Sequence, residues 1–236
     1  TCDWSSDVCS SDLDVREARE FTEKLFKTRF EFPEIRGAGR AEIEIKGDYH
    51  RPRLDFEFSL SPAGFERFEV TTARGQVAVE GGNVEGKVYV LDKNFQGHVE
   101  INNHNGRTET RLLMDRALVE TALAYLKVDF PIRGPARGDF IYITEDQRIN
   151  FQGDFTSEEM LLLGSPIKNV SGKIIWDERG LSFPELKFNL NGGEVSGKLA
   201  LGFEPGTYDF DLKATGVDLK PFSSDFSGRI NLDLKG

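Results

Sequence analysis

Period-2 alternation is the feature that most constrains how this chain folds. Over most of its length apolar side chains recur at every second position, as in Leu54, Phe56 and Phe58, which are separated by Asp55 and Glu57. Successive side chains on a β-strand point to opposite faces, so each apolar set lies on one face. One dry face and one wet face are typical of an antiparallel sheet. The sequence therefore predicts an all-β fold.

The same alternation marks strands along the rest of the chain. Apolar sets occur at 41–45, 77–79, 88–90, 99–101, 141–143, 186–190, 195–203, 208–214 and 230–234. Asn105-Gly106 and Asn191-Gly192 between strands suit the type I′ turns of two-residue hairpins. We therefore expect consecutive strands to pair as hairpins.

A glycine followed by a polar residue stands near the start of several of these strands. The glycines occur at 39, 86, 97, 138, 172, 197 and 228, with spacings that vary too much for a solenoid of fixed coil length. Glycine near a strand start indicates a bulge or a bend. Bends repeated in this way predict an elongated, curled antiparallel sheet that forms a taco-like apolar groove.

Only a few segments have helical spacing. Residues 14–30 predict an amphipathic helix that Asp14 caps, and a second helix is expected near 115–127, after Asp115. Shorter helical turns are compatible with 157–163 and with the segment around Pro221. One or two short helices are thus expected beside the sheet.

The first thirteen residues are set apart from the rest. Residues 1–13 resemble the conceptual translation of a sequencing-adapter oligonucleotide, and we interpret them as artefactual. Both cysteines, Cys2 and Cys9, lie in this segment. The β-groove repeat domain is then expected at 31–236. The adapter-like segment precedes this domain, and the strand pattern is still in progress at Gly236. We therefore expect the natural sequence to be truncated at both ends.

The residues that carry chemistry form no catalytic or metal-binding pattern. His98 and His104 lack further ligands at zinc spacing, and the carboxylates alternate outward on strands. Neither a nucleophile elbow nor a phosphate loop is present in the sequence. The net charge of −10 disfavours nucleic acid as a partner. We expect no enzyme activity, no catalytic residues, no metal and no cofactor.

The apolar face itself is then the candidate functional surface. The chain has 19 Phe and only 2 Trp, and rings on one face must be buried or must meet something apolar. The residues that we expect to face lipid on one apolar surface are Phe56, Phe58, Val88, Val90, Leu199, Leu201, Phe210, Leu212, Ile230 and Leu232. The alternative is a scaffold domain whose apolar face is a closed core, as in a sandwich or barrel, with no ligand.

The C-terminal third carries a resemblance to a known family. It lies in Val170-Ser-Gly-Lys-Ile-Ile-Trp-Asp177, in 181–201, in 208–222 and in Phe226-Ser-Gly-Arg-Ile-Asn-Leu-Asp-Leu-Lys-Gly236. These segments resemble the sequence repeats of the AsmA/TamB superfamily. The resemblance is clear over about 165–236 and looser over 35–155. The resemblance is one of repeat style, since no catalytic signature is involved.

The resemblance implies a lipid-conducting groove of the bridge-like lipid transfer type. Members of this superfamily are periplasmic, anchored to the inner membrane by an N-terminal helix, and act in phospholipid transport or outer-membrane biogenesis. The implied partners are phospholipid acyl chains and, for TamB members, an outer-membrane barrel protein. This sequence contains neither the anchor nor a recognisable TamB C-terminal end.

Overall fold

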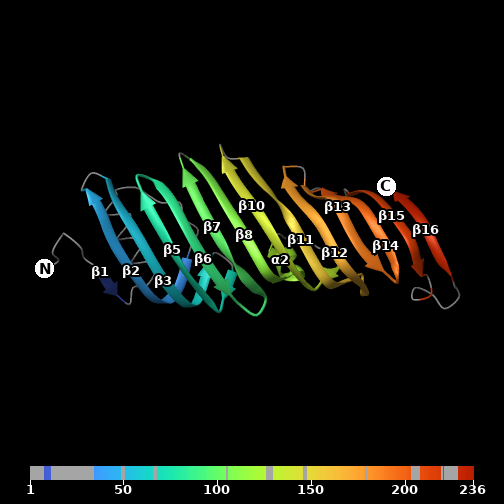
Figure 1. Cartoon of the computed structure of the whole chain (residues 1–236), viewed down its shortest axis with the longest axis horizontal. Coiled ribbons are helices and arrows are strands. Elements are labelled where there is room, and N and C mark those ends of the chain that lie inside the picture. The colour runs from blue at the N-terminus through green and yellow to red at the C-terminus, as the bar shows by residue number, and fades with distance from the viewer. Residues whose placement is uncertain are drawn as a thin grey trace. The chain divides into compact units, whose positions relative to one another are not determined.

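The structure of the chain is a computed structural model. The structure describes residues 8–11, 35–48, 51–65, 68–104, 106–125, 130–145, 148–178, 180–202, 208–218, 220 and 228–236. The helix expected over 14–30 and the turn expected around Pro221 lie outside these residues. The described part is almost entirely β-strand (Figure 1).

The strands form one antiparallel sheet that is not closed, which confirms the expected all-β, open-sheet class. The strand order is β1-β2-β3-β5-β6-β7-β8-β10-β11-β12-β13-β14-β15-β16, with β4 beside β3 and β9 beside β11. Apart from these two short strands, sheet order follows chain order, as hairpin connections require.

By contacts, the chain divides into two units, which are described separately: unit 1 is Thr1–Thr110 and unit 2 is Arg111–Gly236. Unit 1 contains β1 Val8–Ser11, β2 Ile35–Asp48, β3 Arg51–Phe65, β4 Phe68–Val70, β5 Thr72–Glu80, β6 Asn83–Leu91, β7 Phe95–His104 and the first residues of β8 Arg107–Leu118. Unit 2 contains the rest of β8, α2 Val119–Tyr125, β9 Ile132–Arg133, β10 Pro135–Glu145, β11 Arg148–Leu162, β12 Ser165–Asp177, β13 Gly180–Leu190, β14 Gly193–Gly202, β15 Tyr208–Asp218 and β16 Arg229–Lys235.

Tight turns connect several of the strands. In the β13–β14 hairpin Asn191 and Gly192 have φ of 46° and 76°, and in the β5–β6 hairpin Gly81 and Gly82 have φ of 57° and 86°. Two consecutive positive φ angles define the type I′ turn. The turn predicted at Asn191-Gly192 is therefore confirmed. Asn105 lies outside the described residues.

The register is interrupted at several points. The sites are between Gly37 and Gly39, Lys168 and Ser171, Lys173 and Ile175, Phe183 and Leu186, and Thr215 and Val217. Bulges increase the local twist of a sheet and bend it. Of the repeat glycines, Gly39 lies at such a site, whereas Gly86, Gly97 and Gly138 lie in regular ladders. The expectation of a bulge or bend therefore fits Gly39 and also Gly172, which lies between two register shifts, and a bulge is absent from the ladders at Gly86, Gly97 and Gly138.

The helical segments differ from expectation in two places. Residues 115–118 belong to β8, and the helix α2 begins only at Val119, whose N–H donates to the carbonyl of Gly134. The turn expected at 157–163 is instead the end of β11, because Met160 and Leu162 pair with Ile167 and Ser165 of β12. Cross-strand pairing here overrides the helix propensity of the Glu- and Leu-rich sequence.

The segment interpreted as artefactual contains the edge strand β1. Val8–Ser11 pairs with β2 from Glu44 to Ala41. This pairing leaves the origin of residues 1–13 as a prediction.

Candidate functional site

The candidate site in unit 1 is one face of its sheet, here called the apolar face of unit 1. Register places Ile43, Phe56 and Val77 side by side across β2, β3 and β5, and Leu54 beside Val79 in the next row. The face comprises Gly39, Ala41, Ile43, Ile45, Leu54, Phe56, Phe58, Leu60, Ala73, Gly75, Val77, Val79, Val84, Gly86, Val88, Val90, Gly97, Val99, Ile101 and Asn103. It carries no charged residue. The opposite, polar face bears the charges of the same strands.

Burial on the apolar face of unit 1 is deepest at Leu54, which is fully buried. Leu54 packs in a cluster with Ile43, Val79 and Val84. A second cluster combines Leu60, Ala63 and Ala73. Farther along β6 and β7, Val88, Val90, Val99 and Ile101 are only half-buried, and Ile45 of β2 is 42% exposed. The face is thus packed in places and accessible in others.

The apolar face of unit 2 is built in the same way. Register and bulges bring together Gly138, Phe140, Tyr142, Phe151, Gly153, Phe155, Met160, Leu162, Ile167, Val170, Gly172, Ile174, Trp176, Leu181, Phe183, Leu186, Phe188, Leu190, Val195, Gly197, Leu199, Leu201, Phe210, Leu212, Ala214, Val217, Ile230, Leu232 and Leu234. Its largest cluster includes Met160, Ile167 and Phe188, and Val119 of α2 packs against it. At β16, Leu232 and Leu234 are 41% and 43% exposed.

Aromatic rings line β10 to β13 on the apolar face of unit 2. Phe140 and Phe151 stack with ring centroids 5.3 Å apart, and Trp176 meets Phe151 edge-on at 6.3 Å. Phe155 and Phe183 form a further edge contact at 6.0 Å. Such pairs add to the stability that apolar burial provides. The rings also make this part of the face aromatic, whereas unit 1 is mainly aliphatic.

Glycines on both apolar faces leave room for large neighbours. Gly75 lies opposite Phe58 and Val88, and Gly172 lies opposite Phe155 and Leu186. A Cβ on Gly172 would stand 2.9 Å from ring carbons of Phe155, closer than real contacts allow. Gly172 therefore requires glycine because the ring of Phe155 occupies the space of its Cβ, whereas a Cβ on Gly75 would stand 2.5 Å from the backbone carbonyl oxygen of Lys87. Small residues between large ones let an apolar face bend inward without clashes.

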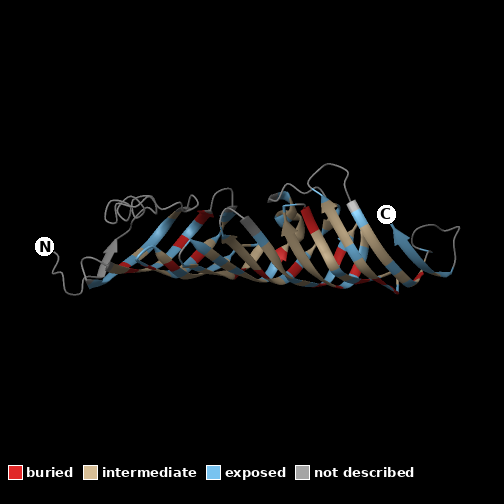
Figure 2. Cartoon of the chain, turned by 90° about the horizontal axis from the view of Figure 1, so that it is seen from above, coloured by how far each residue is buried: buried red, intermediate tan, exposed pale blue. Residues whose placement is uncertain are grey.

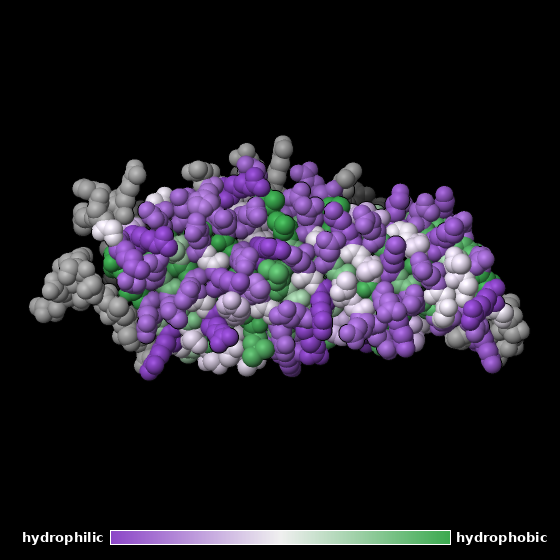
Figure 3. All heavy atoms as spheres, in the orientation of Figure 1, coloured by the Kyte–Doolittle hydropathy of each residue, from purple (hydrophilic) through white to green (hydrophobic). Residues whose placement is uncertain are grey.

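Buried residues are distributed along the strands of a single layer (Figure 2). The face turned toward the viewer in Figure 3 is mostly hydrophilic, with hydrophobic side chains showing only in places between the polar ones. Alternating apolar and polar residues predict one polar and one apolar face for such a sheet, and the hydrophilic side in Figure 3 agrees with this expectation.

A charged triad lies on the polar face of unit 1. Asp55 accepts hydrogen bonds from Lys46 Nζ at 3.0 Å and from Arg53 Nε at 2.8 Å. Burial alone would raise the pKa of Asp55, but these two bonds outweigh it and hold the pKa below its ordinary value. The triad thus joins β2 and β3 on the side away from the apolar face.

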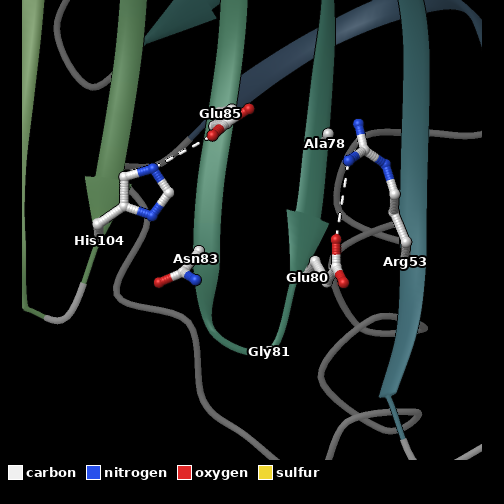
Figure 4. A pocket seen from close by; sticks show the side chains of 7 residues that line it. All are labelled: Arg53, Ala78, Glu80, Gly81, Asn83, Glu85 and His104. Atoms are coloured by element: carbon white, nitrogen blue, oxygen red, sulfur yellow. Dashed lines mark hydrogen bonds and ion pairs between the residues drawn. The ribbon is translucent and has the colours of Figure 1, made fainter.

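A shallow hollow on the same polar face surrounds the small side chain of Ala78 (Figure 4). Arg53 Nη1 lies 3.7 Å from Glu80 Oε2, and His104 Nε2 lies 3.1 Å from Glu85 Oε1. The two carboxylates are more than half exposed, so these are surface ion pairs, which stabilise a fold only weakly. Nothing in their geometry points to acid–base chemistry.

Metal sites and membrane-spanning helices are absent from the part of the chain that the structure describes. Within them, no three side chains of His, Cys, Asp or Glu gather closely enough to hold a metal ion. Their helices include none that is long and apolar enough to cross a bilayer.

The residues expected to face lipid lie on the two apolar faces. Phe56, Phe58, Val88 and Val90 belong to unit 1, and the remaining six, Leu199, Leu201, Phe210, Leu212, Ile230 and Leu232, belong to unit 2. Most are half-buried, and Leu232 is exposed. Their neighbours Glu57 and Lys198 lie on the polar faces. Whether any of the ten contacts lipid stays a prediction.

The aromatic set of β10 to β13 was not among the residues selected from the sequence. Its signal in the sequence is the alternation of Phe151, Gly153 and Phe155 at every second position. The sequence predicted that Ile141 and Ile143 lie on the apolar face, and this prediction is wrong. Both lie on the polar face, because Ile141 pairs with Gln152 and Ile143 with Asn150.

Comparison with known proteins gives no match. No family model matches the chain, and no curated protein or solved structure matches it.

Proposed function

We propose that the chain is a section of a lipid-conducting β-groove, in which the apolar faces of units 1 and 2 contact phospholipid acyl chains. The observation that carries this proposal is that each unit has an apolar face over successive strands of an open sheet, accessible at Ile45 in unit 1 and at Leu232 and Leu234 in unit 2. Contiguous apolar surface that is left exposed marks a site of contact with a partner or a lipid.

The physical chemistry of acyl chains suits such a surface. Burial of a hydrocarbon chain gains about 0.8 kcal/mol per CH₂, so a 16-carbon chain gains on the order of 10 kcal/mol before the cost of ordering it. A chain of CH₂ groups needs no hydrogen-bond partner. A dry face without a polar constellation is therefore sufficient to bind it, and no catalytic group is required.

Together with the resemblance of 165–236 to AsmA/TamB repeats, this favours a periplasmic protein anchored to the inner membrane and active in phospholipid transport or outer-membrane biogenesis. An outer-membrane barrel protein would then be its macromolecular partner. The competing proposal is a scaffold domain of the cell envelope that binds no ligand. It is favoured by the packed clusters around Leu54 and Met160, which already bury part of each face.

The test is the lipid content of the purified protein. The chain is expressed in a didermic bacterium, purified in mild detergent, washed, and extracted with organic solvent for mass spectrometry. The lipid-groove proposal expects phospholipid at a reproducible molar ratio. The matched variant replaces Leu199, Leu212 and Leu232 with Ser and should retain less lipid. A protein free of lipid, or equal lipid in both forms, would favour the scaffold.

A further inference from the structure

The β11–β12 hairpin ends in two exposed leucines, here called the leucine tip. Leu163 is 77% exposed and Leu161 is 44% exposed. Leu161 pairs with Pro166 across the hairpin, which places it on the polar face rather than among the lipid-facing candidates. The tip is therefore a surface separate from the apolar face of unit 2.

The turn at this tip is of a type that leucine rarely occupies. Leu163 and Gly164 have φ of 52° and 80°, which match Asn191-Gly192 and Gly81-Gly82 in two other turns of this type among the described residues. A left-handed conformation is costly for leucine and easy for glycine or asparagine. The chain thus places a large apolar side chain where its other turns carry Asn or Gly, and this residue gains little packing in return.

The tip is held in place and carries no charge of its own, and among the described residues Arg133 of β9 is the one charged residue that pairs with it, opposite Leu161. The N–H of Leu163 donates to the carbonyl of Pro131 at 2.9 Å, so the turn is fixed against the segment that follows α2. Residues 160–167 contain no charged side chain, in a chain that is 30% charged. The first charges back along the hairpin, Glu159 and Lys168, face each other at 3.9 Å and offset one another.

From these observations we propose that the leucine tip inserts into the interfacial region of an uncharged phospholipid bilayer. An exposed apolar hairpin end with no charged residue over 160–167 complements the boundary between headgroups and hydrocarbon. The net charge of −10 opposes approach of the chain to an anionic membrane surface. A bilayer of neutral phospholipid is therefore the membrane that the tip fits. The proposal does not depend on what the apolar faces carry, because neither Leu161 nor Leu163 belongs to them.

The test is co-flotation of the full chain with phosphatidylcholine vesicles, comparing wild type with Leu163→Asn. Asparagine fits the turn, so this variant should unfold at the same temperature as wild type or higher, while its vesicle-bound fraction falls about tenfold. Leu91→Asn is the matched control, because Leu91 is 53% exposed on the polar face of unit 1 and should not alter binding.

Each other outcome overturns the proposal. It fails if wild type does not float with the vesicles, if Leu163→Asn floats as wild type does, or if Leu91→Asn loses as much binding. It also fails if Leu163→Asn changes the oligomeric state in size-exclusion chromatography while vesicle binding stays the same, because the tip would then contact a second copy. The lipid content of the purified protein is a separate measurement, so failure here leaves the groove proposal standing.

Discussion

The ring of Phe140 lies over Gly138, two residues earlier on the same strand, in the space that a Cβ at position 138 would occupy. The backbone of Gly138 is otherwise regular, and its partner across the ladder is Phe155. Glycine is needed here because an aromatic side chain lies flat on the apolar face, and not because the backbone bends.

This relationship predicts coupled mutations. Gly138→Ala should destabilise unit 2 by about 1–3 kcal/mol, since the added methyl group overpacks the face. In a Phe140→Leu background the same change should cost clearly less, because the ring is gone. Urea unfolding of the four proteins measures the coupling. An equal cost in both backgrounds would mean that the ring is not what excludes the methyl group.

A second prediction concerns the core of unit 1. Leu54→Ala should lower the free energy of unfolding by about 2–5 kcal/mol, because Leu54 is fully buried in its cluster. Leu91→Ala, at an exposed position of the same unit, should change it by less than about 0.5 kcal/mol. Chemical denaturation checks both. Similar losses at the two positions would contradict the assignment of faces.

A third prediction concerns acid stability. The pKa of Asp55 is lower in the folded protein than its ordinary value of about 4, so the carboxylate stabilises the fold above that value, and this stabilisation disappears as pH falls through the folded pKa. Asp55→Asn should therefore lose stability less steeply between about pH 4 and pH 2. Thermal unfolding midpoints across this range measure the difference. Parallel curves would show that Lys46 and Arg53 do not hold the proton off Asp55.

A fourth prediction tests the register of β10 and β11. Phe140 is buried, while Ile141 next to it lies half-buried on the polar face. Phe140→Ala should cost about 3–5 kcal/mol, and Ile141→Thr less than about 1 kcal/mol. The two free energies come from the same denaturation experiment. The reverse order would place the isoleucines on the apolar face.

The alternation of the sequence was sufficient to assign faces where apolar and polar residues strictly alternate. Leu54, Phe56 and Phe58 all fall on one face, and Glu57 falls on the other, because each strand there has only one apolar phase. At 140–143 every residue is apolar, so the sequence alone is equally compatible with residues 140 and 142 or residues 141 and 143 on the apolar face. Only the pairing with Phe151, Gln152 and Gly153 selects one of them.

Pairing also decided the parts that local sequence predicted incorrectly. Glu158, Glu159 and the leucines that follow favour a helix locally, but β12 provides partners for this segment out to Leu162. The irregularity there is visible only in the fold: Asn169 has φ of 52°, and Met160 and Ile167 thereby join the same cluster as Val170. The leucine tip could not be recognised from sequence, because its conformation depends on that hairpin.

The central claim, that the apolar faces meet acyl chains, is tested most directly by photo-crosslinking at adjacent positions on opposite faces. A photoreactive amino acid is placed at Phe58 or Glu57 in unit 1 and at Leu199 or Lys198 in unit 2, and lipid adducts are measured by mass spectrometry after irradiation in cells. Phospholipid adducts at Phe58 and Leu199, with none at Glu57 and Lys198, are the predicted result. Equal capture at both members of each pair, or no capture at any position, would contradict the claim.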